Sequence, residues 1–415
     1  MSIGDVFEVD LTAPAYGGES LGRLPDGRAL FVPFALPGER VRVRIIEEKR
    51  GFARAALETV LTPAPERIAP RCRHFGVCGG CHYQMLPYPR QLEMKQAVLR
   101  DTFQRIAAIP DPPVEPVRPS PAEWNYRNSL QLHLSAAGRV GFLRAGSDEV
   151  VEIRECHLPE AALAALWPQL DFEPGAPLER ISLRTGSDEE ALLALESDEA
   201  DIPNMVIDLD ISVVHLSGDD SVVLAGEDTL VYEVLGRAFR VSGGSFFQVN
   251  TAQAAALVSH VLDGLALAPD QSVLDLYSGV GLFSAFLAPR VAQVTGIEIS
   301  PAACEDFAVN LDEFENVTLY EGAAEQVLPE LGLRPHAAVV DPPRAGLERA
   351  AVDALLALRP ARLVYVSCDP ATLARDAKRL IAGGYRLERV TPFDMFPQTY
   401  HIESVSLFTW QGTQA

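Results

Sequence analysis

The strongest constraint on the fold of this chain is a change of pattern at about Gly243, after which short apolar runs alternate with helical stretches. Short apolar runs are typical of strands that are buried on both faces. Strands separated by helices form mostly parallel sheets with helices on both sides. The runs are Val273–Leu276, Val294–Ile297, Ala337–Val340, Leu363–Val366 and Val405–Phe408. Residues 241–415 are therefore predicted to form an α/β domain with a doubly wound, Rossmann-like sheet.

Two further regions precede this domain. Residues 1–62 contain alternating apolar and polar runs separated by glycine and proline turns, which predicts an OB-like β-barrel. Residues 63–240 hold strand-like runs such as SLQLHLS and RISLRT, which predict a β-rich central domain with a mainly antiparallel sheet. A helical pattern over residues 88–108 lies in this second region and is a candidate to pack on the C-terminal domain.

Charge is distributed unevenly along the chain. The formal net charge of −22 argues against a nucleic-acid partner, but residues 40–100 contain twelve Lys or Arg and five acidic residues. A basic segment on an acidic body indicates a surface that faces a polyanion, with a solvated charged face as the alternative. The sequence has no run of eighteen apolar residues and no signal peptide, so we expect a cytoplasmic protein that binds no membrane.

A glycine-rich turn follows the first apolar run of the C-terminal domain. Asp275 ends the strand, and Gly279 and Gly281 allow the backbone to pass close to a ligand at a helix N-terminus. Glu298 ends the next strand, where a carboxylate can accept hydrogen bonds from both ribose hydroxyls. The D-x-x-x-G-x-G form differs from the dinucleotide fingerprint and favours S-adenosylmethionine, which has no pyrophosphate. A nicotinamide enzyme, or a turn without a ligand, is the alternative.

The segment DPPR places Asp341 at the end of the third apolar run. Because the carboxyl ends of strands in such a sheet line the ligand crevice, Asp341 should face it. Enzymes that methylate amino groups carry an aromatic residue after the two prolines, whereas this chain has Arg344. The segment therefore favours a ring N–H, rather than an exocyclic amine, as the partner of Asp341.

Two reactive side chains follow. Cys368 lies at a strand end before a helix that begins near Ala371, and a thiol near the positive end of a helix is expected to have a lowered pKa. Glu403 precedes the last run, where apolar neighbours would raise its pKa and suit it to accept a proton. A structural cysteine and a surface carboxylate are the alternatives, and Cys304 is assigned to a small buried residue.

A nucleophile and a base beside a methyl donor fit the methylation of uracil at C5. This carbon is a poor nucleophile until a thiolate adds at C6 and produces an enolate. The enolate can take a methyl group from a sulfonium, a base then removes the C5 proton, and the thiolate leaves. The sequence thus predicts Cys368 as the nucleophile and Glu403 as the general base.

The order of these motifs resembles the RNA uridine-C5 methyltransferase family. The matching segments are GSFFQVN at 244–250, Asp275–Gly281, DPPR, SCDPATLARD and HIES. The resemblance implies an S-adenosylmethionine-dependent RNA (uracil-5-)-methyltransferase in which Cys368 and Glu403 are catalytic. The residues that it implies around the methyl donor and the target uracil are Gln248, Tyr277, Glu298 and Asp341. Many members carry Asn where this chain has Leu282, which puts one donor contact in doubt.

Three cysteines lie within ten residues, at Cys72, Cys78 and Cys81, and Cys156 follows in a later loop. In a large chain without a secretion signal, such residues are expected to be reduced thiols, metal ligands or catalytic groups. The spacing leaves open a structural zinc ion or an iron–sulfur cluster. The family resemblance implies a [4Fe-4S] cluster held by these four thiolates. Because methyl transfer is redox-neutral, the role of the cluster would be structural or in RNA binding.

The N-terminal region resembles a TRAM domain, notably in FVPFALPGERVRVRI. A TRAM domain together with the cysteine cluster is similar to the family branch that methylates 23S rRNA, where the target base would flip into the crevice. We therefore expect a monomeric enzyme that acts on RNA and not on DNA. Alternatives are a tRNA uridine or cytosine-C5 methyltransferase and a non-catalytic RNA-binding protein. Trp124, Tyr126 and Arg127 are candidate RNA contacts, with a core aromatic pair as the alternative.

Overall fold

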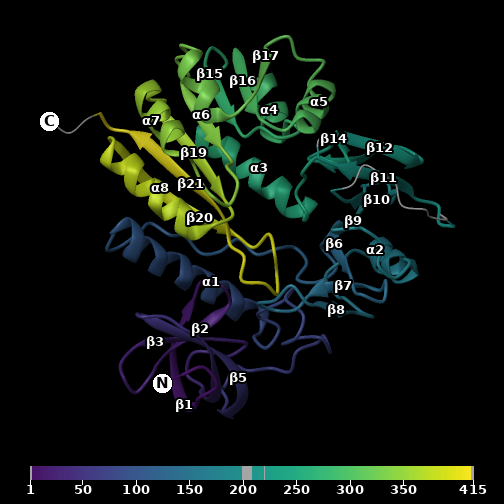
Figure 1. Ribbon diagram of the computed structural model, residues 1–415. Helices are drawn as coiled ribbons and strands as arrows, with labels where there is room; N and C mark the ends of the chain where they lie inside the picture. Colours follow the sequence, from purple (N-terminus) through teal and green to yellow (C-terminus); the bar gives the residue numbers. More distant parts are fainter. Residues whose placement is uncertain (1, 199–207, 219, 413–415) are drawn as a thin grey trace.

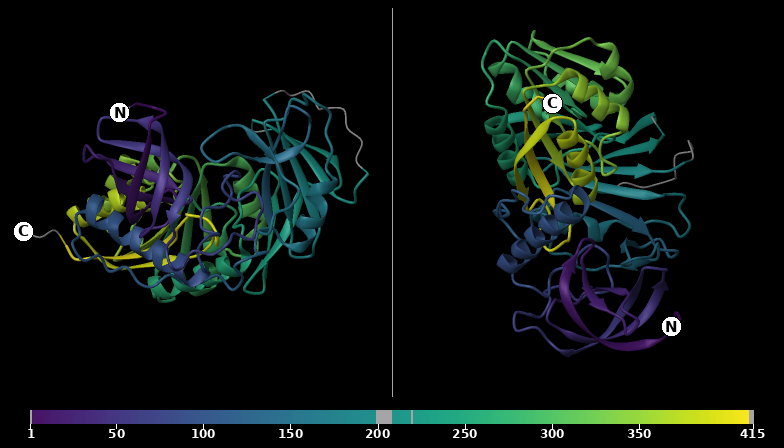
Figure 2. Two further views of the ribbon diagram at one scale, coloured as in Figure 1. Left: turned by 90° about the horizontal axis from the view of Figure 1, so that it is seen from below. Right: turned by 90° about the vertical axis from the view of Figure 1, so that its left-hand side faces the viewer.

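The computed structural model describes residues 2–198, 208–218 and 220–412. The chain forms an N-terminal barrel, a central sheet with a two-stranded hairpin, and a C-terminal α/β domain (Figure 1). The barrel, in purple, lies at the opposite end of the molecule from the first half of the C-terminal domain, in light green (Figure 2). No helix in the described part of the chain is long and apolar enough to cross a membrane.

The N-terminal barrel is closed by five strands in the order β1-β2-β3-β5-β4, with β1 pairing to both β2 and β4. Alternate residues along β4 are buried, so Val41, Val43 and Ile45 fill the barrel while the arginines between them face outward. The predicted barrel is confirmed. Its strands are β1 (Val6–Ala15), β2 (Glu19–Arg23), β3 (Ala29–Pro33), β4 (Arg40–Glu48) and β5 (Phe52–Thr62).

The central region contains a seven-stranded sheet in the order β12-β11-β10-β9-β6-β7-β8. All neighbouring strands are antiparallel except β10 and β11, which agrees with the prediction of a mainly antiparallel sheet. The strands are β6 (Ser129–Leu134), β7 (Val140–Leu143), β8 (Val150–Glu152), β9 (Arg180–Thr185), β10 (Ala191–Glu196), β11 (Ser212–Ser217) and β12 (Asp220–Ala225). Helix α2 (Ala161–Leu166) packs on this sheet through Leu163. A hairpin of β13 (Thr229–Val234) and β14 (Arg237–Ser242) leads into the C-terminal domain.

The C-terminal domain is built on a seven-stranded sheet in the order β17-β16-β15-β18-β19-β21-β20. The first five of these strands are parallel, and β21 and β20 complete the sheet with antiparallel pairs. The strands are β15 (Ser272–Leu276), β16 (Gln293–Glu298), β17 (Val317–Glu321), β18 (Ala337–Val340), β19 (Arg362–Ser367), β20 (Tyr385–Phe393) and β21 (Glu403–Trp410). The helices are α3 (Thr251–Leu265), α4 (Leu282–Leu287), α5 (Pro301–Asn310), α6 (Ala324–Val327), α7 (Arg349–Leu358) and α8 (Pro370–Ala382).

Both faces of this sheet are covered by helices, as the apolar runs predicted. Val273 and Val339 pack into a core cluster that includes residues of α3, α4 and α5. Their neighbours Leu274 and Ala338 pack into a second cluster on the other face with residues of α7 and α8. Because successive side chains of a strand point to opposite faces, only an apolar run can fill both clusters.

Helix α1 (Tyr88–Thr102) comes from the central region but packs on the C-terminal domain. It continues into a π-helical turn, Phe103–Ala107, that ends at Ala108 with a left-handed φ of 59°. Leu99 and Phe103 are fully buried in the same cluster as the apolar face of α8. In Figure 1 this helix lies between the barrel and strand β20.

Candidate active site

The predicted site residues come from the same edge of the C-terminal sheet. The loop with Gly279, and also Glu298, Asp341 and Cys368, follow or end the parallel strands β15, β16, β18 and β19. Glu403 begins β21, which is antiparallel to β19 and therefore starts at the edge where β19 ends. The topology thus brings together residues that lie more than one hundred positions apart in the chain.

The glycine loop contains left-handed backbone conformations at two glycines, as expected, and also at Tyr277, where the residue type does not predict one. Tyr277, Gly279 and Gly281 all have positive φ values, of 62°, 53° and 89°. A Cβ atom on Gly281 would lie 2.3 Å from Leu311 Cδ1, so the position also lacks space for a side chain. Leu282, the position that departs from many family members, is buried in the core cluster at the start of α4.

Glu298 fixes the glycine loop to the next strand. One carboxylate oxygen accepts a hydrogen bond of 2.8 Å from the backbone N–H of Gly279. The other oxygen accepts bonds from the N–H groups of Ile299 and Ser300, each of 2.8 Å. These contacts orient the carboxylate between the glycine loop and the N-terminus of α5.

Asp275 lies beneath the glycine loop and is fully buried. Burial raises its pKa to about 7, although Ser284 donates a hydrogen bond of 2.6 Å to Oδ2. Its other oxygen, Oδ1, is buried without a hydrogen-bond partner among the described residues. This carboxyl stores unfavourable desolvation energy that a bound ligand or a proton can relieve.

Cys368 does not have the lowered pKa that its place before a helix predicted. Burial, together with the charges of Glu403 and Asp341, raises the pKa of the thiol to about 12, against the opposing effect of Arg344. The helix N-terminus is already occupied, because the Asp369 side chain accepts bonds of 2.9 Å from two backbone N–H groups of α8. The prediction was therefore wrong for the free protein, in which the thiol keeps its proton at neutral pH.

Glu403 has the raised pKa that its apolar setting predicted. The side chain is buried, and burial together with the charge of Asp341 raises its pKa well above the ordinary value, against the opposing effect of Arg344. Burial also raises the pKa of Asp341 to about 7. Two carboxyls and one thiol thus lie within electrostatic reach of one another, so each disfavours the ionisation of the others.

Arg344, at the position where enzymes that methylate amino groups carry an aromatic side chain, supplies a positive charge at this edge. Its guanidinium donates a hydrogen bond of 2.8 Å to Nδ1 of His401. Burial and the Arg344 charge lower the pKa of His401 to about 3, so the imidazole is neutral and can accept this bond. Arg344 therefore connects the DPPR segment to the segment that carries Glu403.

The segment GSFFQVN lies before helix α3, at the junction with the central sheet. Gln248 is buried, and its backbone carbonyl accepts a bond of 3.0 Å from Asn128. Phe247 stacks on Tyr232 with ring centroids 4.6 Å apart. Phe246 next to it is 69% exposed, which is unusual for a large apolar side chain, and it was not singled out from the sequence.

The barrel contributes a residue that the sequence analysis missed. Tyr16 donates a hydrogen bond of 3.1 Å to Asp369, the residue after Cys368, and meets the ring of Tyr400 edge-on at 5.6 Å. In the sequence, Tyr16 was recognised only as part of a Tyr-Gly-Gly turn. Its contact is with a residue 353 positions away, so no local pattern could identify it.

The four cysteines predicted as metal ligands line one cavity of about 480 Å³. Backbone N–H groups of His74 and Gly80 approach the sulfur atoms of Cys72 and Cys78, each at 3.4 Å. Burial raises the pKa of Cys156 to about 11. In the part of the chain that the structure describes, no group of three or more His, Cys, Asp or Glu side chains is arranged to hold a metal ion. Cys304, assigned to a structural role, is buried.

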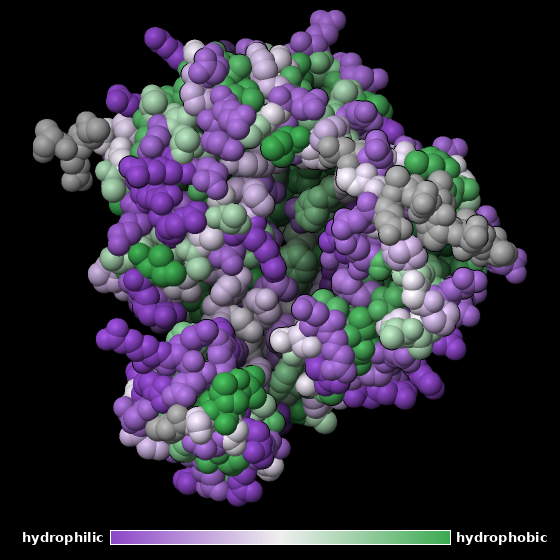
Figure 3. Space-filling model, viewed as in Figure 1, coloured by the Kyte–Doolittle hydropathy of each residue, from purple (hydrophilic) through white to green (hydrophobic). Residues whose placement is uncertain are grey.

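The same cavity extends to the catalytic edge. Its lining includes Arg127, Arg344, Phe396 and His401 together with residues of the segment 72–83, called the cysteine loop below. Figure 3 shows the molecule hollowed between the C-terminal domain and the central sheet. Of the three candidate RNA contacts, Tyr126 is buried and donates a bond of 3.0 Å to the carbonyl of Pro397, so it has a core position.

Comparison with known proteins agrees with this geometry. Residues 196–331 and 333–410 match the family described as tRNA (Uracil-5-)-methyltransferase, and residues 2–57 match the TRAM domain. An uncharacterized RNA methyltransferase of Thermosynechococcus vestitus is 34% identical, with 98% of both chains covered. One of Staphylococcus aureus is 32% identical, with 96% of both chains covered.

A solved structure resembles the whole molecule. It is that of the Pyrococcus abyssi tRNA (uracil-54, C5)-methyltransferase in complex with S-adenosyl-L-homocysteine. The two structures superpose with a TM-score of 0.73 at 27% sequence identity, and the match covers 97% of this chain and 100% of that chain.

Proposed function

Since this chain belongs to the tRNA (uracil-5-)-methyltransferase family and is an S-adenosylmethionine-dependent RNA methyltransferase, we propose that it methylates C5 of a specific uridine in 23S rRNA. We further propose that it acts as a monomer in the cytoplasm. The observation that carries the proposal is the convergence of Cys368, Glu403 and Asp341 at one sheet edge beside the glycine loop. A thiol and a buried carboxyl at this place suit covalent catalysis on an electrophilic ring.

The proposed mechanism assigns a separate role to each residue. The Cys368 thiol loses its proton to solvent, and the resulting thiolate adds to C6 of the uracil and gives an enolate whose C5 becomes nucleophilic. S-adenosylmethionine, when bound, would supply the electrophilic methyl group that C5 takes; the S–CH3 bond breaks and S-adenosylhomocysteine is the leaving group. Glu403 then removes the C5 proton, the C6–S bond breaks, and the thiolate is regenerated. Asp341 accepts a hydrogen bond from the ring N–H of the target base.

The donor pocket is assigned to the residues of the glycine loop and its neighbours. Glu298 already receives the N–H of Gly279, and a carboxylate fixed in this way can accept bonds from ribose hydroxyls. Gly281 leaves room for the close packing of α4 against α5. The full set of proposed donor and base contacts is Gln248, Tyr277, Gly279, Gly281, Glu298 and Asp341.

We propose that Cys72, Cys78, Cys81 and Cys156 hold a [4Fe-4S] cluster. All four line one cavity, and backbone N–H groups point at two of the sulfur atoms, which suits thiolate ligands. Burial is the main cause of the raised pKa values of Cys78 and Cys156, and charge interactions with other cysteines of the group contribute. The cluster would stabilise the loop or contribute to RNA binding, because the reaction itself transfers no electrons.

A tRNA uridine is the second candidate substrate. It is favoured by the similarity to the Pyrococcus abyssi tRNA (uracil-54, C5)-methyltransferase. The rRNA proposal rests on the resemblance of the TRAM domain and the cysteine loop to the rRNA branch. The match to the Pyrococcus abyssi enzyme covers 97% of this chain and so includes the barrel as well. A barrel that places Tyr16 against Asp369 would hold looped RNA directly beside the nucleophile.

The deciding experiment is to map 5-methyluridine by mass spectrometry in ribosomal and transfer RNA from cells with and without this protein. Loss of one modified uridine from 23S rRNA, with tRNA unchanged, is the expected result. Loss from tRNA alone would assign the second substrate. Unchanged 5-methyluridine in both RNAs would refute the proposed function.

A further inference from the structure

The segment 394–402 connects β20 to β21 and carries Glu403 at its end. Five consecutive backbone carbonyls, from Asp394 to Gln398, accept hydrogen bonds from residues outside the segment. The first four carbonyls accept one bond each from a side chain, in order those of Gln253, Asn250, Lys95 and Tyr126. The carbonyl of Gln398 accepts bonds from the backbone N–H groups of His82 and Tyr83. Connecting loops usually leave such carbonyls to water, so this segment is held in place by its surroundings to an unusual degree.

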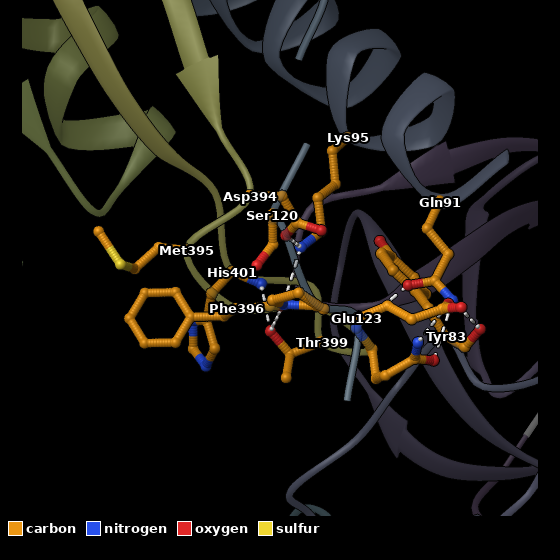
Figure 4. Close-up of polar contacts among 12 residues, drawn as sticks. Tyr83, Gln91, Lys95, Ser120, Glu123, Asp394, Met395, Phe396, Thr399 and His401 are labelled. Carbon is orange, nitrogen blue, oxygen red and sulfur yellow. Dashed lines mark hydrogen bonds and ion pairs between the residues drawn. The ribbon is translucent and has the colours of Figure 1, made fainter. Parts of the chain in front are cut away.

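Among these contacts, those of Lys95 have the largest desolvation cost, because they bury a charged group. Its ammonium group and the carboxylate of Asp394 form an ion pair of 2.6 Å, and both side chains are 0% exposed. Lys95 also donates a bond of 3.1 Å to the carbonyl of Phe396 (Figure 4). A buried ion pair is often no more stabilising than apolar residues of similar volume, because both charges lose their hydration. Stability alone therefore does not explain a lysine at this position.

Gln91 lies one turn before Lys95 on the same face of α1. Its side-chain amide donates to Oε1 of Gln398 at 2.9 Å and accepts from the backbone N–H of Gln398 at 3.1 Å. Residues spaced by four positions face the same side of a helix, so α1 contacts the segment through two neighbouring side chains, Gln91 and Lys95. Figure 4 shows both side chains reaching from the helix to the segment.

The contacts that hold segment 394–402 are linked to Glu403 at both ends of the segment. Asp394 follows Phe393, which pairs with Glu403 across β20 and β21. On the other side, Thr399 donates a bond of 2.8 Å to the carbonyl of Phe396 and accepts one of 3.2 Å from the N–H of His401. Only Ile402 separates His401 from the catalytic carboxylate, so a shift at Phe396 would move Glu403.

We propose that Lys95 and Gln91 are positioning residues for the general base: they hold the segment 394–402 so that Glu403 points at C5 of the target uracil. The inference rests on the proposed function. Proton removal requires the carboxylate within hydrogen-bond reach of the proton, whereas the earlier addition of Cys368 does not depend on Glu403 in the same way. Loss of the contacts that Lys95 and Gln91 make should therefore slow the release of the methylated base more than it slows the formation of the covalent adduct.

The test uses two variants of the full chain and separates the two steps. Lys95→Met/Asp394→Leu replaces the ion pair by apolar side chains and should fold with a melting temperature close to that of the wild type. Gln91→Met leaves the ion pair intact. The probe is ribosomal RNA transcribed in vitro, either with uridine or with 5-fluorouridine, whose C5 carries fluorine after methylation and offers no proton to a base.

With 5-fluorouridine RNA, the rate of adduct formation on both variants should lie within about threefold of the wild-type rate. With uridine RNA, both variants should turn over at least tenfold more slowly and accumulate the covalent adduct, which denaturing gels detect. Asp101→Asn, which removes a charge of α1 that is 48% exposed and pairs with Arg105, is the matched control and should behave as the wild type. Misplacement of a catalytic group by about 1 Å is enough for such an effect.

Two results would overturn the proposal. One is a folded Lys95→Met/Asp394→Leu variant that turns over uridine RNA at the wild-type rate. The other is a parallel loss of adduct formation and turnover in both variants, which would indicate a purely structural role. If the wild-type protein itself forms neither 5-methyluridine nor an adduct, the proposed function fails instead, so the two failures are distinguishable.

Discussion

The guanidinium of Arg344 donates a hydrogen bond of 2.8 Å to Nδ1 of His401, and this bond connects the two loops that carry Asp341 and Glu403. The same guanidinium lowers the pKa of both Cys368 and Glu403. One cation thus opposes the effect of burial on the nucleophile and on the base. In the sequence, Arg344 was informative only because it is not aromatic, which argued against an exocyclic amine as the methylated group.

Cys368 should be a slow nucleophile in the free protein, and its reactivity should depend steeply on pH. With a pKa of about 12, its thiolate fraction rises about tenfold for each pH unit between pH 7 and pH 9. The rate of alkylation by iodoacetamide at this residue, followed by peptide mass spectrometry, should rise in the same proportion. A rate that is independent of pH in this range would show that the thiolate already exists.

Arg344→Gln should make Cys368 less reactive still. Removal of the positive charge raises the pKa of the thiol, and we expect alkylation at pH 8 to be about three- to tenfold slower. Arg349→Gln removes an exposed charge in the same part of the chain that pairs with Asp353, and serves as the control. Equal rates in the two variants would mean that Arg344 does not act on the thiol.

Glu403→Gln should separate addition from release. The variant lacks the base that removes the C5 proton, so the covalent RNA adduct on Cys368 should accumulate and survive denaturation. The adduct should be absent when Cys368→Ala is added to the same variant. If that double variant gives an adduct of the same mass at the same site, the nucleophile has been assigned wrongly.

Asp275→Asn should stabilise the protein at alkaline pH. The folded-state pKa of Asp275 is about 7, above its ordinary value of 3.8, so the folded protein loses stability as the pH rises through this interval. The corresponding free energy is on the order of 4 kcal/mol. Melting temperatures should be similar for variant and wild type at pH 4 and higher for the variant at pH 8. Exposed Asp270→Asn is the control, and an equal effect in both variants would contradict the prediction.

Gly281→Ala should cost more stability than Gly27→Ala. Both glycines have nearly the same φ, 89° and 87°, but a Cβ on Gly281 meets Leu311 at 2.3 Å, whereas the Cβ on Gly27 has no neighbour within 4 Å. The left-handed backbone should cost each variant about 1–2 kcal/mol. Overpacking should add about 1–3 kcal/mol at position 281, measured by urea unfolding, and should also weaken the binding of S-adenosylmethionine. Equal losses in the two variants would exclude the packing effect.

The cysteine loop makes a prediction about metal content. Protein purified without oxygen should be brown and contain about four iron atoms per chain, and Cys81→Ser should abolish the colour. Colourless protein with one zinc ion would refute the cluster and support the zinc alternative. Chelation of the iron should lower the melting temperature of the protein, because the buried thiols then lack their counter-charge.

The sequence predicted those elements whose side chains are buried on both faces. The five apolar runs all lie in strands of the C-terminal sheet, because only apolar residues can fill both core clusters. It missed β17, an edge strand with mostly exposed residues, and β20, in which charged residues interrupt the apolar pattern. In both strands polar or charged residues break the continuous apolar run by which the other strands were identified.

The candidate site followed the same rule. Residues at strand ends could be predicted to meet, because parallel strands end at a common edge. The pKa of Cys368 could not be predicted from the sequence. It depends on burial in the folded protein and on Glu403, which lies 35 positions further along the chain. Tyr16 and Lys95 reach the site from other regions, and their contacts exist only once the barrel and α1 have docked.

The hydrogen bonds from His82 and Tyr83 to the carbonyl of Gln398 have a consequence for the inheritance of this architecture. The cysteine loop and the C-terminal segment share a backbone interface, so a chimera that exchanges one of them between relatives must exchange the other as well. The N-terminal region is tied to the same loop, because Leu36 and Ala64 share a core cluster with Tyr83, Met85 and Leu86. Recombination among these enzymes should therefore keep the barrel, the cysteine loop and the C-terminal segment together.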